Sequence, residues 1–133
     1  MHKIMALDIG TKRIGIALTD YLQVIATPHS TIPRQPEAVA IEAIVKLAKE
    51  NRVEKIVVGV PINMDGSQGF QAQDCIEFSQ KILGFDIIQE DERLTSEEAE
   101  ERLRTRKVDF RKNKGLVDME SAAIILEQYL SRK

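Results

Sequence analysis

The feature that most constrains the fold of this chain is a short apolar run near its middle. Within residues 53–60, Ile56, Val57 and Val58 follow one another without an intervening polar residue. A strand without alternation of apolar and polar residues is typical of a sheet that is covered on both faces. We therefore expect residues 53–60 to form a central strand between two layers of helices.

Helical patterns flank this strand on both sides. The helix expected before it opens near Pro36 and places apolar residues three and four apart, at Ile41, Ile44, Val45 and Ala48. A loop over 61–69 leads to a second helix, whose core-facing positions are expected to be Ala72, Cys75, Ile76, Ser79 and Leu83. Strand character resumes over 85–91, so the two strands and the helix between them predict a parallel β-α-β crossover.

The N-terminal part of the chain predicts an antiparallel arrangement. Strands over 4–8 and 14–19 are joined by a turn in which Gly10 permits a positive φ. A third strand is expected between residues 23 and 31. It should lie at an edge of the sheet, because Pro28 cannot donate a backbone hydrogen bond.

The C-terminal part is expected to be helical. Thr95 can cap one helix, and a last helix carries Met119, Ala122, Ala123, Leu126 and Leu130 on one face. The predicted fold class is α/β, with a mixed five-stranded sheet flanked by about four helices. The first three strands are antiparallel and the centre is parallel. Residues 1–133 are expected to form a single domain.

Composition limits the class of protein. Of the 133 residues, 43% are hydrophobic and 30% are charged, a balance that excludes a disordered chain. The N-terminal apolar stretch ends after four residues at Asp8, and no run is long enough to cross a membrane, so we expect a cytoplasmic protein. The lone Cys75 excludes an internal disulfide and a thiolate metal cluster.

The net charge of −2 gives no electrostatic reason for the whole chain to bind a polyanion. The charges are nevertheless segregated: residues 86–101 hold eight acids and one base, whereas residues 102–114 hold seven bases and one acid. This pattern fits a solvated helix with intrahelical ion pairs that runs into a loop. It fits equally well a segment that binds phosphates, and the sequence leaves both interpretations open.

Three carboxylates fall at the ends of elements that this order brings together: Asp8, Glu92 and Asp118. Carboxylates about 4 Å apart repel by roughly 1 to 4 kcal/mol per pair unless a cation lies between them. Mg²⁺ or Mn²⁺ takes such oxygen ligands and promotes hydrolysis of phosphodiesters. Taken singly, the same acids could be a turn residue, a surface acid and a helix cap, so the prediction of a metal site depends on their conjunction.

Polar residues near these acids are candidates for contacts with substrate phosphates. Lys12 and Arg13 follow Asp8 in the turn, and Arg93 follows Glu92 directly. Asn63 lies in a turn that could either cap the second helix or help hold a phosphate at the helix N-terminus. The basic segment adds further candidates at Arg111, Lys112 and Lys114.

Four blocks of this sequence resemble the YqgF/RuvX family of resolvases and pre-16S ribosomal RNA nucleases. The blocks are MALDIGTKRIGIA (5–17), VVGVPINMDGS (57–67), DERLTS (91–96) and KGLVDMESAAIIL (114–126). They occur in the same order and span nearly the whole chain. The resemblance implies a ribonuclease H-like fold, with Asp8, Glu92 and Asp118 as catalytic metal ligands.

The resemblance also implies an activity and partners. We expect a Mg²⁺- or Mn²⁺-dependent nuclease that acts on structured RNA in processing of the pre-16S rRNA 5′ end, on a ribosomal precursor particle. A weak homodimer is the expected oligomeric state. The alternatives are a Holliday junction resolvase that acts on branched DNA, and a noncatalytic RNA-binding assembly factor.

The turn after Asp8 allows one more interpretation. An Asp-x-Gly sequence in a strand-turn-strand hairpin also resembles the first phosphate loop of the ATP-binding proteins related to actin, Hsp70 and sugar kinases. Those proteins need a second lobe and an adenosine loop, and 133 residues are too few for both.

Overall fold

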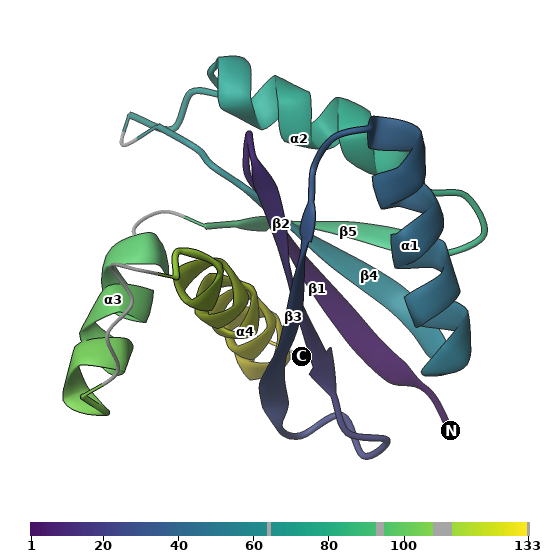
Figure 1. Ribbon diagram of the computed structural model, residues 1–133, viewed down its shortest axis with the longest axis horizontal. Coiled ribbons are helices and arrows are strands. Elements are labelled where there is room, and N and C mark those ends of the chain that lie inside the picture. The colour runs from purple at the N-terminus through teal and green to yellow at the C-terminus, as the bar shows by residue number, and fades with distance from the viewer. Residues whose placement is uncertain (64, 93–94, 108–112, 133) are drawn as a thin grey trace.

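The computed structural model describes residues 1–63, 65–92, 95–107 and 113–132, with the side chains of 95 and 96 left aside. The elements, in chain order, are β1 (Lys3–Ile9), β2 (Arg13–Thr19), β3 (Ala26–Pro33), α1 (Glu37–Glu50), β4 (Val53–Val60), α2 (Phe70–Gln80), β5 (Asp86–Asp91), α3 (Thr95–Thr105) and α4 (Gly115–Ser131) (Figure 1). None of the helices in the described part of the chain combines the length and apolar character that a membrane span requires.

The five strands form one mixed sheet in the order β3-β2-β1-β4-β5. β1 pairs antiparallel with β2, and β2 pairs antiparallel with β3. β1 and β4 are parallel, as are β4 and β5, so the crossover through α2 has the predicted form. The predicted α/β class and the division of the sheet into antiparallel and parallel parts are confirmed.

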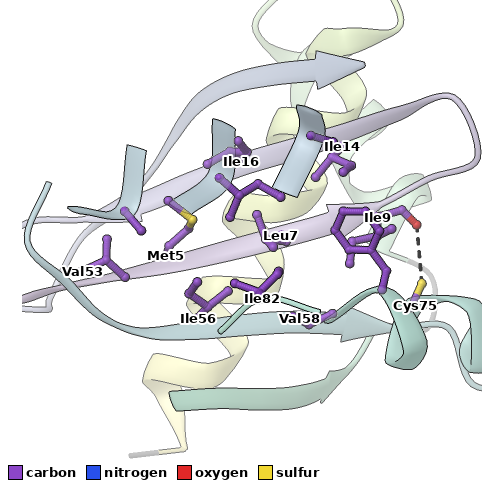
Figure 2. Close-up of a cluster of buried hydrophobic side chains, with 14 of the residues drawn as sticks. Met5, Leu7, Ile9, Ile14, Ile16, Val53, Ile56, Val58, Cys75 and Ile82 are labelled. Atoms are coloured by element: carbon purple, nitrogen blue, oxygen red, sulfur yellow. Dashed lines mark hydrogen bonds between the residues drawn. The ribbon is translucent and has the colours of Figure 1, made fainter. Parts of the chain in front are cut away.

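Helices cover both faces of the sheet. Figure 1 shows α1 and α2 on one side and α4 on the other, with α3 beside α4. The face under α1 and α2 is built from large apolar side chains, among them Met5, Leu7 and Ile9, which Figure 2 labels, and also Ile44 and Phe78. All five are buried. Among the described residues, this cluster contains more buried apolar side chains than the cluster on the opposite face of the sheet.

The face under α4 is built from smaller residues. On this face, β1 contributes Ala6 and β2 contributes Ala17, and both pack against Ala122 and Ala123 of α4. Short side chains on both partners allow the helix axis to lie close to the sheet. The position of α4 therefore follows from the strand alternation that directs Met5 and Leu7 to the opposite face.

Two details of the sequence-based prediction were wrong. α2 ends at Gln80, and Leu83, which was expected in the core, is 78% exposed, whereas Phe78 and Ile82 are buried. The third strand begins three residues later than expected. The reason is that the Asp20 carboxylate accepts hydrogen bonds from the backbone N–H groups of residues 24 and 25 and holds them in a turn.

Candidate active site

A cleft of about 410 Å³ lies at the end of the sheet where β1, β4 and β5 terminate. Residues of the β1–β2 turn, α2, α3 and the beginning of α4 line it, and they include Asp8, Gln71, Asp74, Glu92, Glu97 and Asp118. The three acids singled out from the sequence therefore reach one cavity from three separate parts of the chain.

Asp8 lies on the α4 side of the sheet because residues alternate along β1. Ile4 and Ala6 precede it on the same face and pack against α4. Asp8 pairs with Gly15 on β2, and a Cβ atom at Gly15 would clash with the backbone carbonyl of Asp118. The absence of a side chain at Gly15 thus allows the first turn of α4 to rest on β2, directly beside Asp8.

Glu92 immediately follows β5 and keeps the alignment of that strand. Its backbone N–H donates to the carbonyl of Val60 at 3.2 Å, which continues the parallel pairing by one residue. A Cβ atom at Gly59 would lie 2.8 Å from Oε2 of Glu92. A second glycine, Gly59 on β4, therefore makes room for the Glu92 carboxylate.

The electrostatics of the cleft centre on Asp8. Burial and then the negative charge of Asp118 raise the pKa of Asp8 from 3.8 to about 6, while a hydrogen bond with the Glu92 side chain acts in the opposite direction. A carboxyl group with this pKa holds its proton in mildly acidic solution and loses it near neutrality. The raised pKa shows first that Asp8 is withdrawn from water and second that it lies near the negative charge of Asp118.

Arg13 provides part of the compensating positive charge. Its Nε atom donates to Oδ2 of Asp118 at 2.6 Å, and the two side chains are 35% and 22% exposed. Arg13 was expected to contact substrate phosphates, and in the structure it holds one of the predicted metal ligands.

The carboxylates suit a hard divalent cation by their chemistry. Oxygen ligands are those preferred by Mg²⁺ and Mn²⁺. Among the described residues, no three His, Cys, Asp or Glu side chains are already arranged to hold a metal ion. Asp8 instead bonds to Glu92 and Asp118 bonds to Arg13. The fit to such a cation therefore rests on the chemistry of the donor set, which is three carboxylates that reach one cleft.

Two lysines among the other predicted contact residues lie in the described part of the chain. Lys12 is exposed on the turn, and Lys114 is exposed at the N-cap of α4. Arg93, Arg111 and Lys112 lie outside the described residues.

Asn63 does not cap α2, whose N-cap is Gly69. Its side-chain amide donates to the Ser67 hydroxyl at 3.0 Å, and Asp65 accepts from the backbone N–H of Ser67, so these groups stabilise their own loop. A substrate contact by Asn63 stays a prediction.

The arginines of α3 favour the first of the two interpretations of the charge pattern. Arg102 donates to both carboxylate oxygens of Glu127 at 3.0 and 2.6 Å. Arg106 lies 2.9 Å from the buried Glu120, and Arg104 pairs with acids of its own helix. The pairs made by Arg102 and by Arg106, which directly follows α3, join this segment to α4. All three arginines thus use their positive charge within the protein.

A buried arginine forms an ion pair beside the cleft that was not predicted from the sequence. The Arg34 side chain is 7% exposed and donates to the two oxygens of Asp74 at 2.9 and 3.0 Å. It also donates to the carbonyl of Gly10 at 2.9 Å, and its backbone N–H donates to the carbonyl of Lys12 at 2.9 Å. Arg34 thus ties the β1–β2 turn to α2. No local pattern distinguishes this arginine from a surface residue.

Cys75 lines the cleft without being reactive. Burial and, after it, the charge of Glu92 raise the pKa of its thiol to about 12. Its Sγ lies 3.5 Å from the Ile9 carbonyl, as the dashed line in Figure 2 shows. The thiol is therefore protonated near neutral pH, which agrees with a structural role.

Solved structures with the same architecture are resolvases. Thermus thermophilus RuvC in complex with a Holliday junction substrate matches with a TM-score of 0.60 at 11% identity, over 99% of this chain and 96% of that one. A fowlpox virus resolvase with its Holliday junction DNA matches with a TM-score of 0.59 at 12% identity, over 98% and 97% of the two chains. At such identities the likeness defines the fold, which is the ribonuclease H-like fold of these resolvases.

Sequence similarity then defines the family. Residues 2–132 match the RuvX family, described as Holliday junction resolvase. A relative from Crocosphaera subtropica is 43% identical over 132 residues, which cover 97% of this chain and 92% of the relative. One from Syntrophus aciditrophicus is 40% identical over 131 residues, which cover 96% and 87%. Both have the provisional name of pre-16S rRNA nuclease. This chain belongs to the RuvX family.

Proposed function

We propose that this protein is a Mg²⁺- or Mn²⁺-dependent nuclease that hydrolyses phosphodiester bonds in structured RNA. The observation that carries the proposal is the meeting of Asp8, Glu92 and Asp118 in one cleft, where the pKa of Asp8 is raised to about 6. Membership in the RuvX family supports the same class of activity.

The residues of the cleft have distinct roles in this proposal. Asp8, Glu92 and Asp118 would hold the cation, which when bound supplies positive charge to the phosphodiester as it is attacked. Asp8 loses its proton to become a ligand. Arg13 orients the Asp118 carboxylate, and the exposed Lys12 beside it lies where a substrate phosphate can be bound.

The substrate that we propose is the 5′ end of precursor 16S rRNA, within a ribosomal precursor particle in the cytoplasm. Support comes from the two relatives described above, which match this chain along most of their own length and share that provisional name. The acids and the Gly10 turn lie within the matched residues.

A second candidate substrate is branched DNA. The description of the RuvX family names Holliday junction resolvase, and the fold is shared with two resolvases solved with junction DNA. A phosphodiester is common to both substrates, so the same three acids would serve either reaction.

The test is to incubate purified protein with precursor 16S rRNA and, separately, with a four-way DNA junction, in Mg²⁺, in Mn²⁺ and in EDTA. We expect cleavage of the RNA that needs a divalent cation and is absent in the Asp8→Asn variant. Cleavage of the junction alone would establish the second candidate. Binding of RNA that is equal in EDTA, without cleavage in either metal, would establish a noncatalytic binding protein.

A further inference from the structure

Phe70 is the most exposed of the large apolar side chains in the described part of the chain. Its side chain is 88% exposed, although it belongs to the first turn of a regular helix. A single exposed apolar residue is common on protein surfaces and indicates nothing by itself. The position of Phe70 relative to the cleft is what gives its exposure significance.

Phe70 is the first residue of α2, the helix that contributes to one wall of the cleft that holds the acids. The next residue, Gln71, lines that cleft, and so does Asp74, which lies one helical turn further along α2. Side chains four residues apart on a helix lie on the same face, one above the other. The aromatic ring therefore projects from the same edge of α2 that forms one wall of the cleft.

The helix that carries Phe70 is fixed relative to the acids. Arg34 binds both oxygens of Asp74 and also the carbonyl of Gly10, two residues after Asp8. Its guanidinium lies 4.8 Å from the centre of the Phe78 ring, on the buried side of α2. These contacts hold the first turns of α2 at a constant position beside the β1–β2 turn, so an aromatic surface there is preorganised.

Electrostatic attraction alone is a weak basis for binding nucleic acid in this cleft. The net charge of the chain is −2, and several acids line the cavity. Arg13 and Arg34, the arginines described beside it, are bonded to Asp118 and Asp74. Stacking of bases on aromatic side chains provides affinity that does not depend on net charge and tolerates any base sequence.

We propose that Phe70 is a stacking platform for an unpaired nucleobase of the substrate strand, next to the phosphodiester that lies over the acids. This inference rests on the proposed nuclease function, which it extends with a substrate class: the segment at the cleft is single-stranded or splayed out of a helix. A base inside a duplex has both faces covered by its neighbours and cannot stack on the ring.

Fluorescence of 2-aminopurine tests the proposal. The probe is a set of single-stranded RNA oligonucleotides from the pre-16S 5′ region, each with one 2-aminopurine at a successive position. We expect binding to change the fluorescence at one or two adjacent positions. Phe70→Ala should abolish that change and weaken binding by about 5- to 100-fold, whereas Phe70→Trp should preserve both. The dependence of binding on salt should stay the same, because the ring neutralises no phosphate.

Leu83→Ala is the matched control. Leu83 is also an exposed apolar residue, at 78%, but it follows the far end of α2, about 16 Å along the helix from Phe70. Binding and fluorescence should match the wild type. Both variants change an exposed side chain, so thermal unfolding should be little affected.

Failure of the stacking proposal can be distinguished from failure of the proposed nuclease function. Asp8→Asn should lose cleavage and keep the fluorescence change, because binding and chemistry use different residues. If the wild type binds the oligonucleotides without cleaving any substrate, the nuclease proposal fails and the stacking measurement still stands. Binding by Phe70→Ala that equals the wild type, or a change in oligomeric state caused by this variant, would overturn the stacking role.

Discussion

The two faces of the sheet use the same strands for different purposes. On the face under α1 and α2, successive inward positions of β1 are Met5, Leu7 and Ile9, all large and buried. On the face under α4, the intervening positions are Ile4, Ala6 and Asp8. One strand of seven residues therefore supplies a close-packed core on one side and, near its end, a carboxylate that lines the cleft on the other.

The face under α1 and α2 therefore stabilises the fold, whereas the face under α4 carries the electrostatic strain of the acids. Burying Asp8, and placing it near the charge of Asp118, disfavours its ionised form, as its raised pKa shows. Burial of the apolar cluster under α1 and α2 stabilises the sheet and offsets that cost without occupying the cleft. Substitutions on the two faces should consequently affect different measurements.

The largest effect is expected on the α4 face. Asp8→Asn and Glu92→Gln should each reduce cleavage by at least about 1000-fold, beyond the 10- to 100-fold typical of residues that merely support a metal ligand. Thermal unfolding without metal should show a stability equal to or above that of the wild type, because a repelling charge is removed. Cleavage at the wild-type rate by either variant would show that the substituted residue has no part in the catalytic site.

The apolar face should show the opposite behaviour. Ile44→Ala deletes a fully buried side chain of α1 and should lower the free energy of unfolding by about 2 to 5 kcal/mol, because a cavity is left in the core. The rate of cleavage per folded molecule should be unchanged at a temperature where the variant stays folded. Urea unfolding and an activity assay on the same sample measure both quantities. A loss of turnover comparable to that of Asp8→Asn would show that the two faces are not independent.

A smaller effect is expected from pH. The folded protein binds the Asp8 proton more tightly than the unfolded chain, since the pKa rises from 3.8 to about 6 on folding. The stabilisation from this proton is complete below the ordinary pKa and is lost as the pH rises through about 6. The group should therefore lower the stability of the metal-free protein by at most about 3 kcal/mol between pH 4 and 7.

Asp8→Asn is the control for this pH effect. The difference in unfolding free energy between variant and wild type should grow from pH 4 to pH 7, and cleavage by the wild type should increase over the same range as Asp8 ionises. A difference that stays constant with pH would assign the raised pKa to another group.

The smallest effect is expected from the basic residues that precede α4 in the sequence. Replacing Arg111, Lys112 and Lys114 together by alanine should weaken binding of RNA and flatten its salt dependence. The log-log slope should fall by about 0.7 for each phosphate of a single strand that the variant no longer neutralises. Replacing Arg104, which pairs with acids of its own helix, serves as the comparison and should leave the slope unchanged. An unaltered slope in the triple variant would show that these residues do not bind phosphates.

Much of this architecture could be predicted because its determinants are local. The run Ile56-Val57-Val58 was enough to predict a strand covered on both faces, and the structure has it fully buried. The prediction that Leu83 lies in the core was wrong, because helical spacing continues in the sequence beyond Gln80, where the helix ends. Helical periodicity in a sequence does not indicate where the chain turns away from the core.

The site was harder to predict than the fold. Element order could indicate that Asp8, Glu92 and Asp118 approach one another, since strand ends meet at one edge of a sheet. The partner of Arg13 is 105 residues away, and that of the Arg34 side chain is 40 residues away. Such pairs depend on how α4 and α2 dock, and no spacing within the sequence encodes that.

The close approach of α4 to Gly15 has a consequence for the time at which the site is completed. Protein synthesis delivers Asp8 first, and Asp118 only 110 residues later, on a helix that must dock on a sheet already formed. An incomplete chain that has emerged only as far as Glu92, just after β5, holds two of the three acids and lacks the third. If the proposed function holds, the growing polypeptide would lack hydrolytic activity, and the RNA of the ribosome that is translating it would meet only an incomplete site.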